Sequence, residues 1–202
     1  MVRFLGLALA ALMMMTAPAS AQKFRQGDAS MIPKAEQALQ KINVMQADFT
    51  FQNLAQFNTG RIFIDRLGGK MRMEFDAPLN HLIIANGARV DFIGGNGTVV
   101  NTATQSTPLG LIFGRAAKLS GDVKVLEIAA KGQNAYIAVG QRSKPKQGKV
   151  ILHFLQTSPS WTLHGWGFID PEGRYTKTIL QNVRHGGELS WTLFDVPVPE
   201  TN

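Results

Sequence analysis

Apolar residues follow a helical spacing near the start of the chain and an alternating spacing afterwards. Between residues 31 and 45 they recur at intervals of three and four: Ile32, Ala35, Leu39 and Ile42. This spacing predicts an amphipathic helix over roughly 31–45. Ser30 can cap the helix, and Pro33 falls in its first turn, where a missing N–H does little harm.

After the helix the period falls to two, as in strands that bury one face. Phe49 and Phe51 alternate with polar residues, and Met71 and Met73 alternate with charged ones. Glycine turns separate the strands, and Asn86-Gly87 is the strongest hairpin signal among them. Beyond the alternating stretch 46–60, the predicted strands are 61–66, 70–75, 82–85, 89–93, 98–104, 123–129, 135–139, 150–156, 161–169, 175–183 and 189–194.

A second, short helix is predicted from Thr107 to about Phe113, because a capping residue is followed by Pro108 at the first helical position. So many strands must curl to bury their apolar face, since two short helices cannot cover a large flat sheet. We therefore expect a mainly β, α+β fold: an unclosed, strongly curved antiparallel β-barrel with a small helical lid. Its apolar interior would be available to a ligand.

The N-terminal segment is interpreted as a secretory signal peptide. Arg3 supplies a positive charge, residues 4–16 form an apolar run too short to span a bilayer, and Ala19-Ser20-Ala21 is a cleavage signal. Cleavage after Ala21 leaves 22–202 as a single domain, which we expect in the periplasm. The formal net charge of the whole chain is +7. Export favours acidic proteins or membrane surfaces as partners of this basic chain and disfavours nucleic acid.

Candidate catalytic and metal-binding groups are sparse. The chain has no Cys, which excludes disulfides, thiolate metal sites and a cysteine nucleophile. The four histidines fall on different predicted elements without metal-ligand spacing, so neither a metal nor a cofactor is expected. They are His81, His153, His164 and His185.

Three carboxylates on one predicted hairpin, Asp65, Glu74 and Asp76, could in principle form the acid pair of a glycosidase. Four basic residues are interleaved with them: Arg61, Arg66, Lys70 and Arg72. Cross-strand ion pairing on a solvated face is therefore favoured over catalysis. No enzyme signature remains, and we expect a binding protein rather than an enzyme.

A second basic group flanks Pro145 in a predicted loop: Arg142, Lys144, Lys146 and Lys149. This group is either an ordinary solvated loop or a docking site for an acidic partner or a membrane surface.

The order of these segments resembles that of the periplasmic outer-membrane lipoprotein carrier family, the LolA-like proteins. The motifs that carry the resemblance are Ala47-Asp48-Phe49-Thr50-Phe51-Gln52, Gly60-Arg61-Ile62-Phe63-Ile64-Asp65-Arg66, Lys70-Met71-Arg72-Met73-Glu74-Phe75 with Pro78, Asn86-Gly87, Thr107-Pro108-Leu109, Asp170 with Gly173 and Thr176, Asn182-Val183, and Leu189 and Phe194 followed by Val196-Pro197.

This resemblance implies an unclosed antiparallel barrel with a helical lid and a carrier function. Family members take acylated lipoproteins from an inner-membrane lipoprotein-releasing ABC transporter, hold the acyl chains inside the barrel and deliver them to an outer-membrane lipoprotein acceptor. The acceptor carries an N-terminal Cys, so this chain resembles the soluble carrier, and we expect a monomer. The alternative is a periplasmic module with the same half-barrel that senses lipid or mislocalised lipoprotein; such relatives usually have a second domain.

The resemblance also implies a role for Arg66, which occupies the place of an arginine that latches the lid in the closed state. Leu67 stands where the family usually has Pro. From the alternation of the strands we hypothesise that the lipid-binding cavity is lined by Phe49, Phe51, Ile62, Ile64, Met71, Met73, Phe75, Trp166 and Phe168.

Overall fold

The structure is a computed structural model, and it describes residues 25–54, 56–104 and 117–197. Its elements are β1 (Arg25–Gln26), α1 (Met31–Gln40), β2 (Val44–Asn53), β3 (Gln56–Asp65), β4 (Lys70–Phe75), β5 (Leu82–Asn86), β6 (Arg89–Ile93), β7 (Val99–Ala103), β8 (Val123–Lys131), β9 (Asn134–Gln141), β10 (Lys149–Thr157), β11 (Ser160–Ile169), β12 (Tyr175–His185) and the 3-10 helix η2 (Trp191–Phe194).

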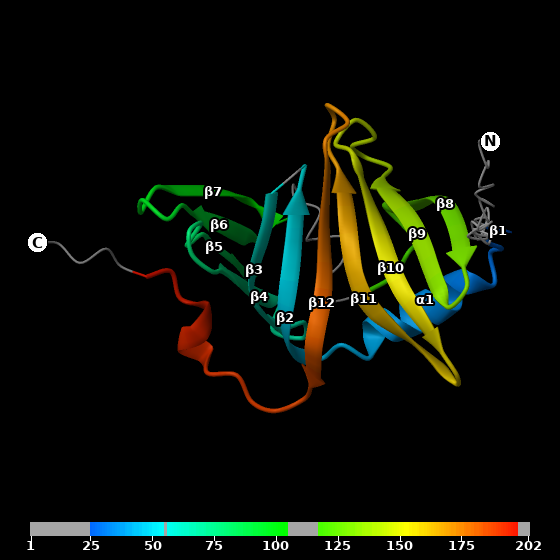
Figure 1. Ribbon diagram of the computed structural model, residues 1–202, viewed down its shortest axis with the longest axis horizontal. Coiled ribbons are helices and arrows are strands. Elements are labelled where there is room, and N and C mark those ends of the chain that lie inside the picture. The colour runs from blue at the N-terminus through cyan, green and yellow to red at the C-terminus, as the bar shows by residue number, and fades with distance from the viewer. Residues whose placement is uncertain (1–24, 55, 105–116, 198–202) are drawn as a thin grey trace, which may run out of the picture.

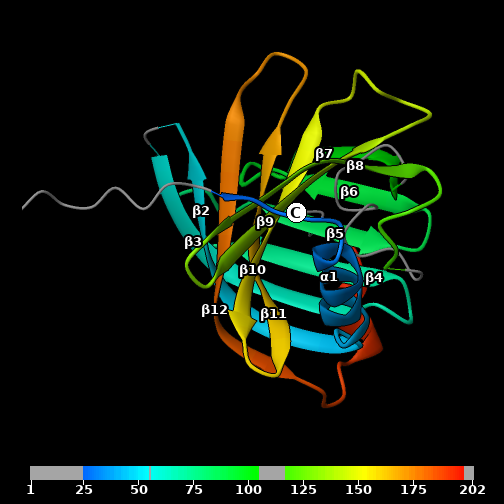
Figure 2. The ribbon, with the colours of Figure 1, turned by 90° about the vertical axis from the view of Figure 1, so that its right-hand side faces the viewer.

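All the strands form one antiparallel sheet in the order β1-β8-β9-β10-β11-β12-β2-β3-β4-β5-β6-β7. Most neighbours are consecutive hairpins, and the pairing of β12 with β2 joins the two halves (Figure 1). The end strands β1 and β7 are not paired with each other within the described residues, so the sheet curves without closing (Figure 2). The expected mainly β fold, an unclosed curved antiparallel sheet, is confirmed.

The pleat of the sheet separates an inner face from an outer one. Residues paired across antiparallel strands point to the same side, so Met45, Ile64, Met71 and Ala85 form one row. This row is buried in the same cluster as residues of α1, which lies on the concave side of the sheet (Figure 2). The inner face therefore holds the hydrophobic core.

The first helix is shorter than the spacing predicts. It ends at Gln40, because the chain turns there and enters β2 at Val44. Ser30 makes no side-chain cap to the helix, so the expected cap is wrong. The backbone N–H and the hydroxyl of Ser30 both donate to the carboxylate of Asp28, which leaves the hydroxyl engaged before the helix begins.

The predicted strand over 189–194 is also wrong. Trp191–Phe194 is a 3-10 helix that lies against the outer face of β4 and β5, where it buries Phe194. The guanidinium of Arg72 donates to the carbonyl oxygen of Leu193 at 2.9 Å. Phe194 is thus buried by packing onto the outer face of the sheet, and the segment does not join the sheet as a strand. The helix predicted from Thr107 lies outside the described residues.

Candidate functional site

The inner face of β2, β3 and β4 is densely packed. Among the nine residues expected to line a cavity, five are at most 3% exposed: Phe49, Ile62, Ile64, Met71 and Met73. Trp166 is also buried, whereas Phe51, Phe75 and Phe168 are partly buried and pack against the same cluster. All nine thus belong to the inner-face cluster, and most of them fill the core.

An apolar pocket of about 550 Å³ opens where this packing ends. Its wall comes from β2 to β7 and the turns between them: Phe51, Asn53, Gln56, Asn58, Phe75, Leu79, His81, Leu82, Ile83, Phe92, Ile93, Gly94, Thr98 and Val100. Only Phe51 and Phe75 of the nine expected residues belong to it. The volume is within the range of roughly 300–1,000 Å³ that is usual for small-molecule sites.

Aromatic rings form one side of the pocket. The ring of Phe75 meets the rings of Phe49 and Phe51 edge to face, at centroid distances of 5.1 and 5.4 Å. Gly60 makes this arrangement possible, since a Cβ there would lie 2.0 Å from the carbonyl oxygen of Glu74 and 2.6 Å from the ring of Phe49. A side chain at residue 60 would therefore displace the ring of Phe49, against which the pocket residue Phe75 packs.

Sequence analysis missed the pocket wall on β5, β6 and β7. The register places Ile83, Phe92 and Val100 in one row with Met73. Because these strands are joined by short turns, the alternation that identified Met73 could have been extended across them. The alternation of apolar residues was present in these strands, but the pairing register was needed to place them beside Met73.

Arg66 connects the hairpin of β3 and β4 to the end of α1. The side chain is buried, its Nε donates to the carbonyl oxygen of Ile42 at 2.7 Å, and its Nη2 donates to that of Gln40 at 3.1 Å. The same Nη2 donates to the side-chain oxygen of Asn43 at 2.9 Å. A guanidinium suits this position, since it presents several donors to the unpaired carbonyls at a helix C-terminus.

The turn that follows Arg66 forms without the proline usual in the family. Gly69 has a positive φ of 68° and its N–H donates to the carbonyl oxygen of Arg66 at 3.1 Å. The carboxylate of Asp65 accepts the N–H of Gly68 at 2.8 Å. Hydrogen bonds thus define the turn in which Leu67 replaces Pro.

The carboxylates of this hairpin are engaged in structural contacts. Glu74 pairs with Arg61 at 2.9 Å and with Arg72 at 2.6 Å on the outer face. Asp76 accepts the hydroxyl of Thr59 at 2.6 Å. The expected cross-strand ion pairing is confirmed for Arg61 of β3 with Glu74 of β4, whereas Arg72 pairs with Glu74 along the same strand and Arg66 is buried and bonded to the end of α1.

Two of the four histidines, which sequence analysis assigned to separate elements, lie together on the outer face. Across the β10–β11 pair the rings of His153 and His164 are 4.9 Å apart, and Tyr136 stacks on His153 at 4.5 Å. His153 Nε2 is 2.7 Å from the side-chain oxygen of Asn134. Burial, together with the smaller effects of the charges of His164 and Lys177, lowers the pKa of His153 to about 4. In the described part of the chain, no three potential metal ligands gather.

The basic loop between β9 and β10 is held at its base. Arg142 Nε donates to the carbonyl oxygen of Gly121 at 2.9 Å, and the Ser143 N–H donates to the carboxylate of Asp122 at 2.8 Å. A smaller hollow of about 290 Å³ lies between this loop and β8, with Lys124 and Leu126 in its wall.

With this geometry in place, comparison with known proteins defines the family. Residues 40–197 match the model described as outer membrane lipoprotein carrier protein LolA, so the chain belongs to the LolA family. The resemblance found in the motifs is confirmed. No curated protein matches the chain.

Among solved structures, the first described here supports the fold. A LolA superfamily protein from Nitrosomonas europaea is 10% identical, has a TM-score of 0.50, and is aligned over 83% of this chain and 96% of its own. An uncharacterized conserved protein from Thermus thermophilus is 12% identical, with a TM-score of 0.49 and coverage of 83% and 93%. MucB is 13% identical, with a TM-score of 0.47, and the match spans 84% of this chain and 63% of MucB.

The protein thus belongs to a periplasmic family of carriers that bind lipoproteins or lipids. Within the described residues, no helix has the length and apolar character needed to cross a membrane.

Proposed function

We propose that this protein is a periplasmic carrier that holds the acyl chains of lipoproteins in the inner-face pocket. It takes them from the inner-membrane lipoprotein-releasing ABC transporter and delivers them to the outer-membrane acceptor. The observation that carries the proposal is the apolar pocket of about 550 Å³ on the concave side of an unclosed sheet. Membership of the LolA family supports the same function.

The energetics fit a carrier. Each buried CH₂ of an acyl chain contributes about 0.8 kcal/mol, so one long chain exposed to water costs on the order of 10 kcal/mol. The pocket wall offers mainly apolar side chains to such a chain. Met71 and Met73 lie in the core beside it, and flexible thioether side chains can adapt to chains of different shape.

In this proposal Arg66 acts as the latch of the lid. Its hydrogen bonds to the carbonyl oxygens of Gln40 and Ile42 hold the end of α1 against the β3–β4 hairpin. Each hydrogen bond to a charged group contributes about 1.5–3 kcal/mol, so the few bonds of Arg66 can be offset by the burial of an acyl chain, which is on the order of 10 kcal/mol. The latch thus allows release, which a rigidly closed cavity would not.

The test places a charge in the pocket and compares it with the same charge on the outer face. Phe51 borders the pocket, and its neighbour Gln52 points to the opposite side of the same strand. Phe51→Lys should abolish release of lipoprotein from spheroplasts, because a buried ammonium opposes the acyl chain, while Gln52→Lys should release it as the wild type does. Two outcomes would contradict the carrier function. One is that both variants release lipoprotein, and the other is that neither the wild type nor the Gln52→Lys control releases it.

Mass spectrometry of protein purified from the periplasm adds a second readout. We expect an acylated lipoprotein to co-purify with the wild type and to be absent from Phe51→Lys. Protein that binds lipoprotein but does not transfer it to outer membranes would favour the sensing module instead.

A further inference from the structure

Two large apolar side chains are exposed at the β2–β3 hairpin, Leu54 just after β2 and Phe57 near the start of β3. Leu54 is 74% exposed and Phe57 is 68% exposed. Neither belongs to the pocket wall, although Asn53, Gln56 and Asn58 from the same hairpin do. These two residues, here called the apolar tip, therefore stand beside the pocket and contribute little to the core.

The backbone at the apolar tip makes Leu54 unusual. Its φ is 51°, in the left-handed region that Gly and Asn adopt far more readily than other residues. A leucine here gains no burial and has the less favoured backbone conformation. Folding thus gives no reason for the choice of leucine, which points to an interaction outside the chain.

The two chain segments at the apolar tip and along β7 contain no charged residue, and charged side chains of neighbouring strands reach the hairpin where Asp76 accepts the hydroxyl of Thr59 and where Lys177 lies opposite Gln52. No Asp, Glu, Lys or Arg occurs between Phe49 and Gly60, nor between Phe92 and Thr104, although the chain as a whole has a net charge of +7. The second stretch includes the partly exposed Val99 and Val100 of β7. Exposed apolar side chains on a margin with few charges match the boundary between the headgroups and acyl chains of a bilayer better than they match a strongly charged protein partner.

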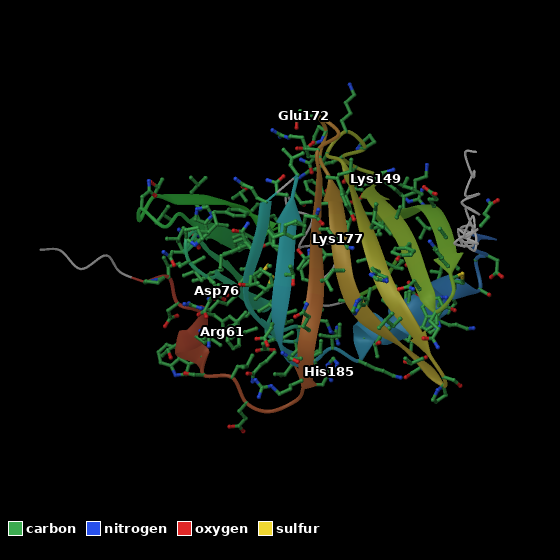
Figure 3. The ribbon with its side chains drawn as sticks, in the orientation of Figure 1. Arg61, Asp76, Lys149, Glu172, Lys177 and His185 are labelled. Carbon is green, nitrogen blue, oxygen red and sulfur yellow. The ribbon has the colours of Figure 1, made fainter. Side chains whose placement is uncertain are left out.

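The basic loop lies at the same end of the sheet. Register places Asn53 opposite Thr176, Thr176 opposite Phe168, and Phe168 opposite Val150, which follows Lys149. The turns β2–β3, β4–β5, β6–β7, β9–β10 and β11–β12 therefore share one edge of the twisted sheet, here called the upper rim. Figure 1 shows the β2–β3, β9–β10 and β11–β12 turns at the top of the molecule. Figure 3 shows Lys149 and Glu172 at this edge and His185 at the opposite one.

The acidic residues of the upper rim near this loop are occupied. Asp170 and Glu172 pair with Arg174 at 2.5 and 3.0 Å. The basic loop contributes Arg142, Lys144, Lys146 and Lys149, with Asp122 at its base. Cations thus outnumber acids on the half of the upper rim that carries the basic loop, and the apolar tip lies on the other half, where the carboxylate of Asp76 accepts the hydroxyl of Thr59.

We propose that the upper rim docks on a phospholipid bilayer, with Leu54 and Phe57 inserted at the interface and the basic loop over anionic headgroups. The inference rests on the proposed carrier function and extends it, because the pocket opens at the same rim. An acyl chain would then pass between bilayer and pocket without crossing water. Apolar insertion and electrostatic attraction are the two contributions that together give interfacial binding.

Because the chain has no Cys, one introduced cysteine can be labelled selectively to test the proposal. Leu54→Cys creates a single site for an environment-sensitive fluorophore, and Leu67→Cys is the matched control. Leu67 is 60% exposed in the β3–β4 turn at the opposite edge. With vesicles of phosphatidylcholine and phosphatidylglycerol, we expect increased, blue-shifted emission from residue 54 and no change from residue 67. Equal responses, or none at residue 54, would overturn the proposal.

Vesicle flotation then separates the two contributions. Leu54→Asn and Phe57→Gln should each weaken vesicle binding about tenfold, since each removes one large apolar side chain from the interface, while Leu67→Asn should not. Asn suits the backbone at residue 54, so folding is preserved. Lys146→Gln should weaken binding about fivefold, and only to vesicles with phosphatidylglycerol. Binding that depends on the lysine but not on the apolar tip would overturn insertion and indicate an acidic partner.

A fluorescent acylated peptide distinguishes failure of this proposal from failure of the carrier function. The Leu54→Asn/Phe57→Gln variant should bind the peptide like the wild type, because neither residue borders the pocket. If the wild type binds vesicles but not the peptide, the carrier function is wrong and docking stands. If it binds the peptide but not vesicles, docking is wrong and the carrier function stands.

Discussion

The inner face of the sheet shows the same alternation of apolar residues in two regions, with different results. In the row of Met45, Ile64 and Met71 the side chains are at most 1% exposed and belong to one cluster with Leu39 of α1. Toward the upper rim the same alternation continues through Phe92 and Val100, which border the pocket. Across the row of Met73, Ile83, Phe92 and Val100, burial falls toward the edge strand β7, whereas the side chains remain apolar.

This difference shows that an apolar inner face is necessary for a pocket but does not define one. Core and pocket differ in what lies opposite the sheet. Near α1 the packing is complete, as in other protein interiors, and toward the upper rim it is not. Substitutions in the two regions should therefore separate stability from binding.

The largest effect is expected from Ile64→Ala. It removes a fully buried side chain and leaves a cavity, so the free energy of unfolding should fall by about 3 kcal/mol. Val100→Ala, at an inner-face position that is 59% exposed, should change it by less than about 0.5 kcal/mol. Urea denaturation of both variants measures the contrast, and equal losses would remove the distinction between the two regions.

Arg66→Leu should have the next largest effect. The substitution leaves the carbonyl oxygens of Gln40 and Ile42 without a donor, so stability should fall by about 2.5 kcal/mol. Arg61→Leu is the control, because it breaks an ion pair whose arginine side chain is 64% exposed and should cost less than about 1 kcal/mol. If thermal unfolding gives the two variants the same melting temperature, Arg66 does not anchor α1.

The contrast between buried and open surface extends to an ionisable group on the outer face. His153 has a pKa of about 4 in the folded protein and about 6.5 when unfolded, so below pH 6.5 the unfolded chain binds the proton more tightly. Stability should therefore be greatest above pH 6.5 and should fall by about 2 kcal/mol between pH 7.5 and pH 5. His153→Gln should flatten this part of the pH profile, and an unchanged slope would assign it to other groups.

Much of the fold was predictable because it rests on local patterns. Alternation identified the strands, and Asn86-Gly87 and the glycine turn after Leu67 identified hairpins that the structure contains. The predictions failed where a segment is placed by packing alone. The alternation predicts a strand that includes residues 191–194, yet these residues form a 3-10 helix that packs on the outer face of β4 and β5.

The candidate site was predicted in part. The expected residues were assigned to the correct face, but five of them fill the core, and the pocket wall on β5 to β7 was missed. Alternation reports the face of a side chain, since the strand period is two, but it does not report how deeply that face is covered. The pairing of His153 with His164 was missed for a related reason, because contact across strands depends on register.

The sequence by itself determined the alternation of apolar and polar residues, the turns, the missing cysteines and the uncharged stretches around Leu54 and Val100. These are properties of neighbouring residues, and they were sufficient to predict a curved antiparallel sheet. Only the tertiary structure decided which apolar residues became core and which became pocket, that Arg66 meets the end of α1, and that the apolar tip and the basic loop share one rim. Each of these depends on contacts between distant segments, whose positions follow from the register and curvature of the whole sheet.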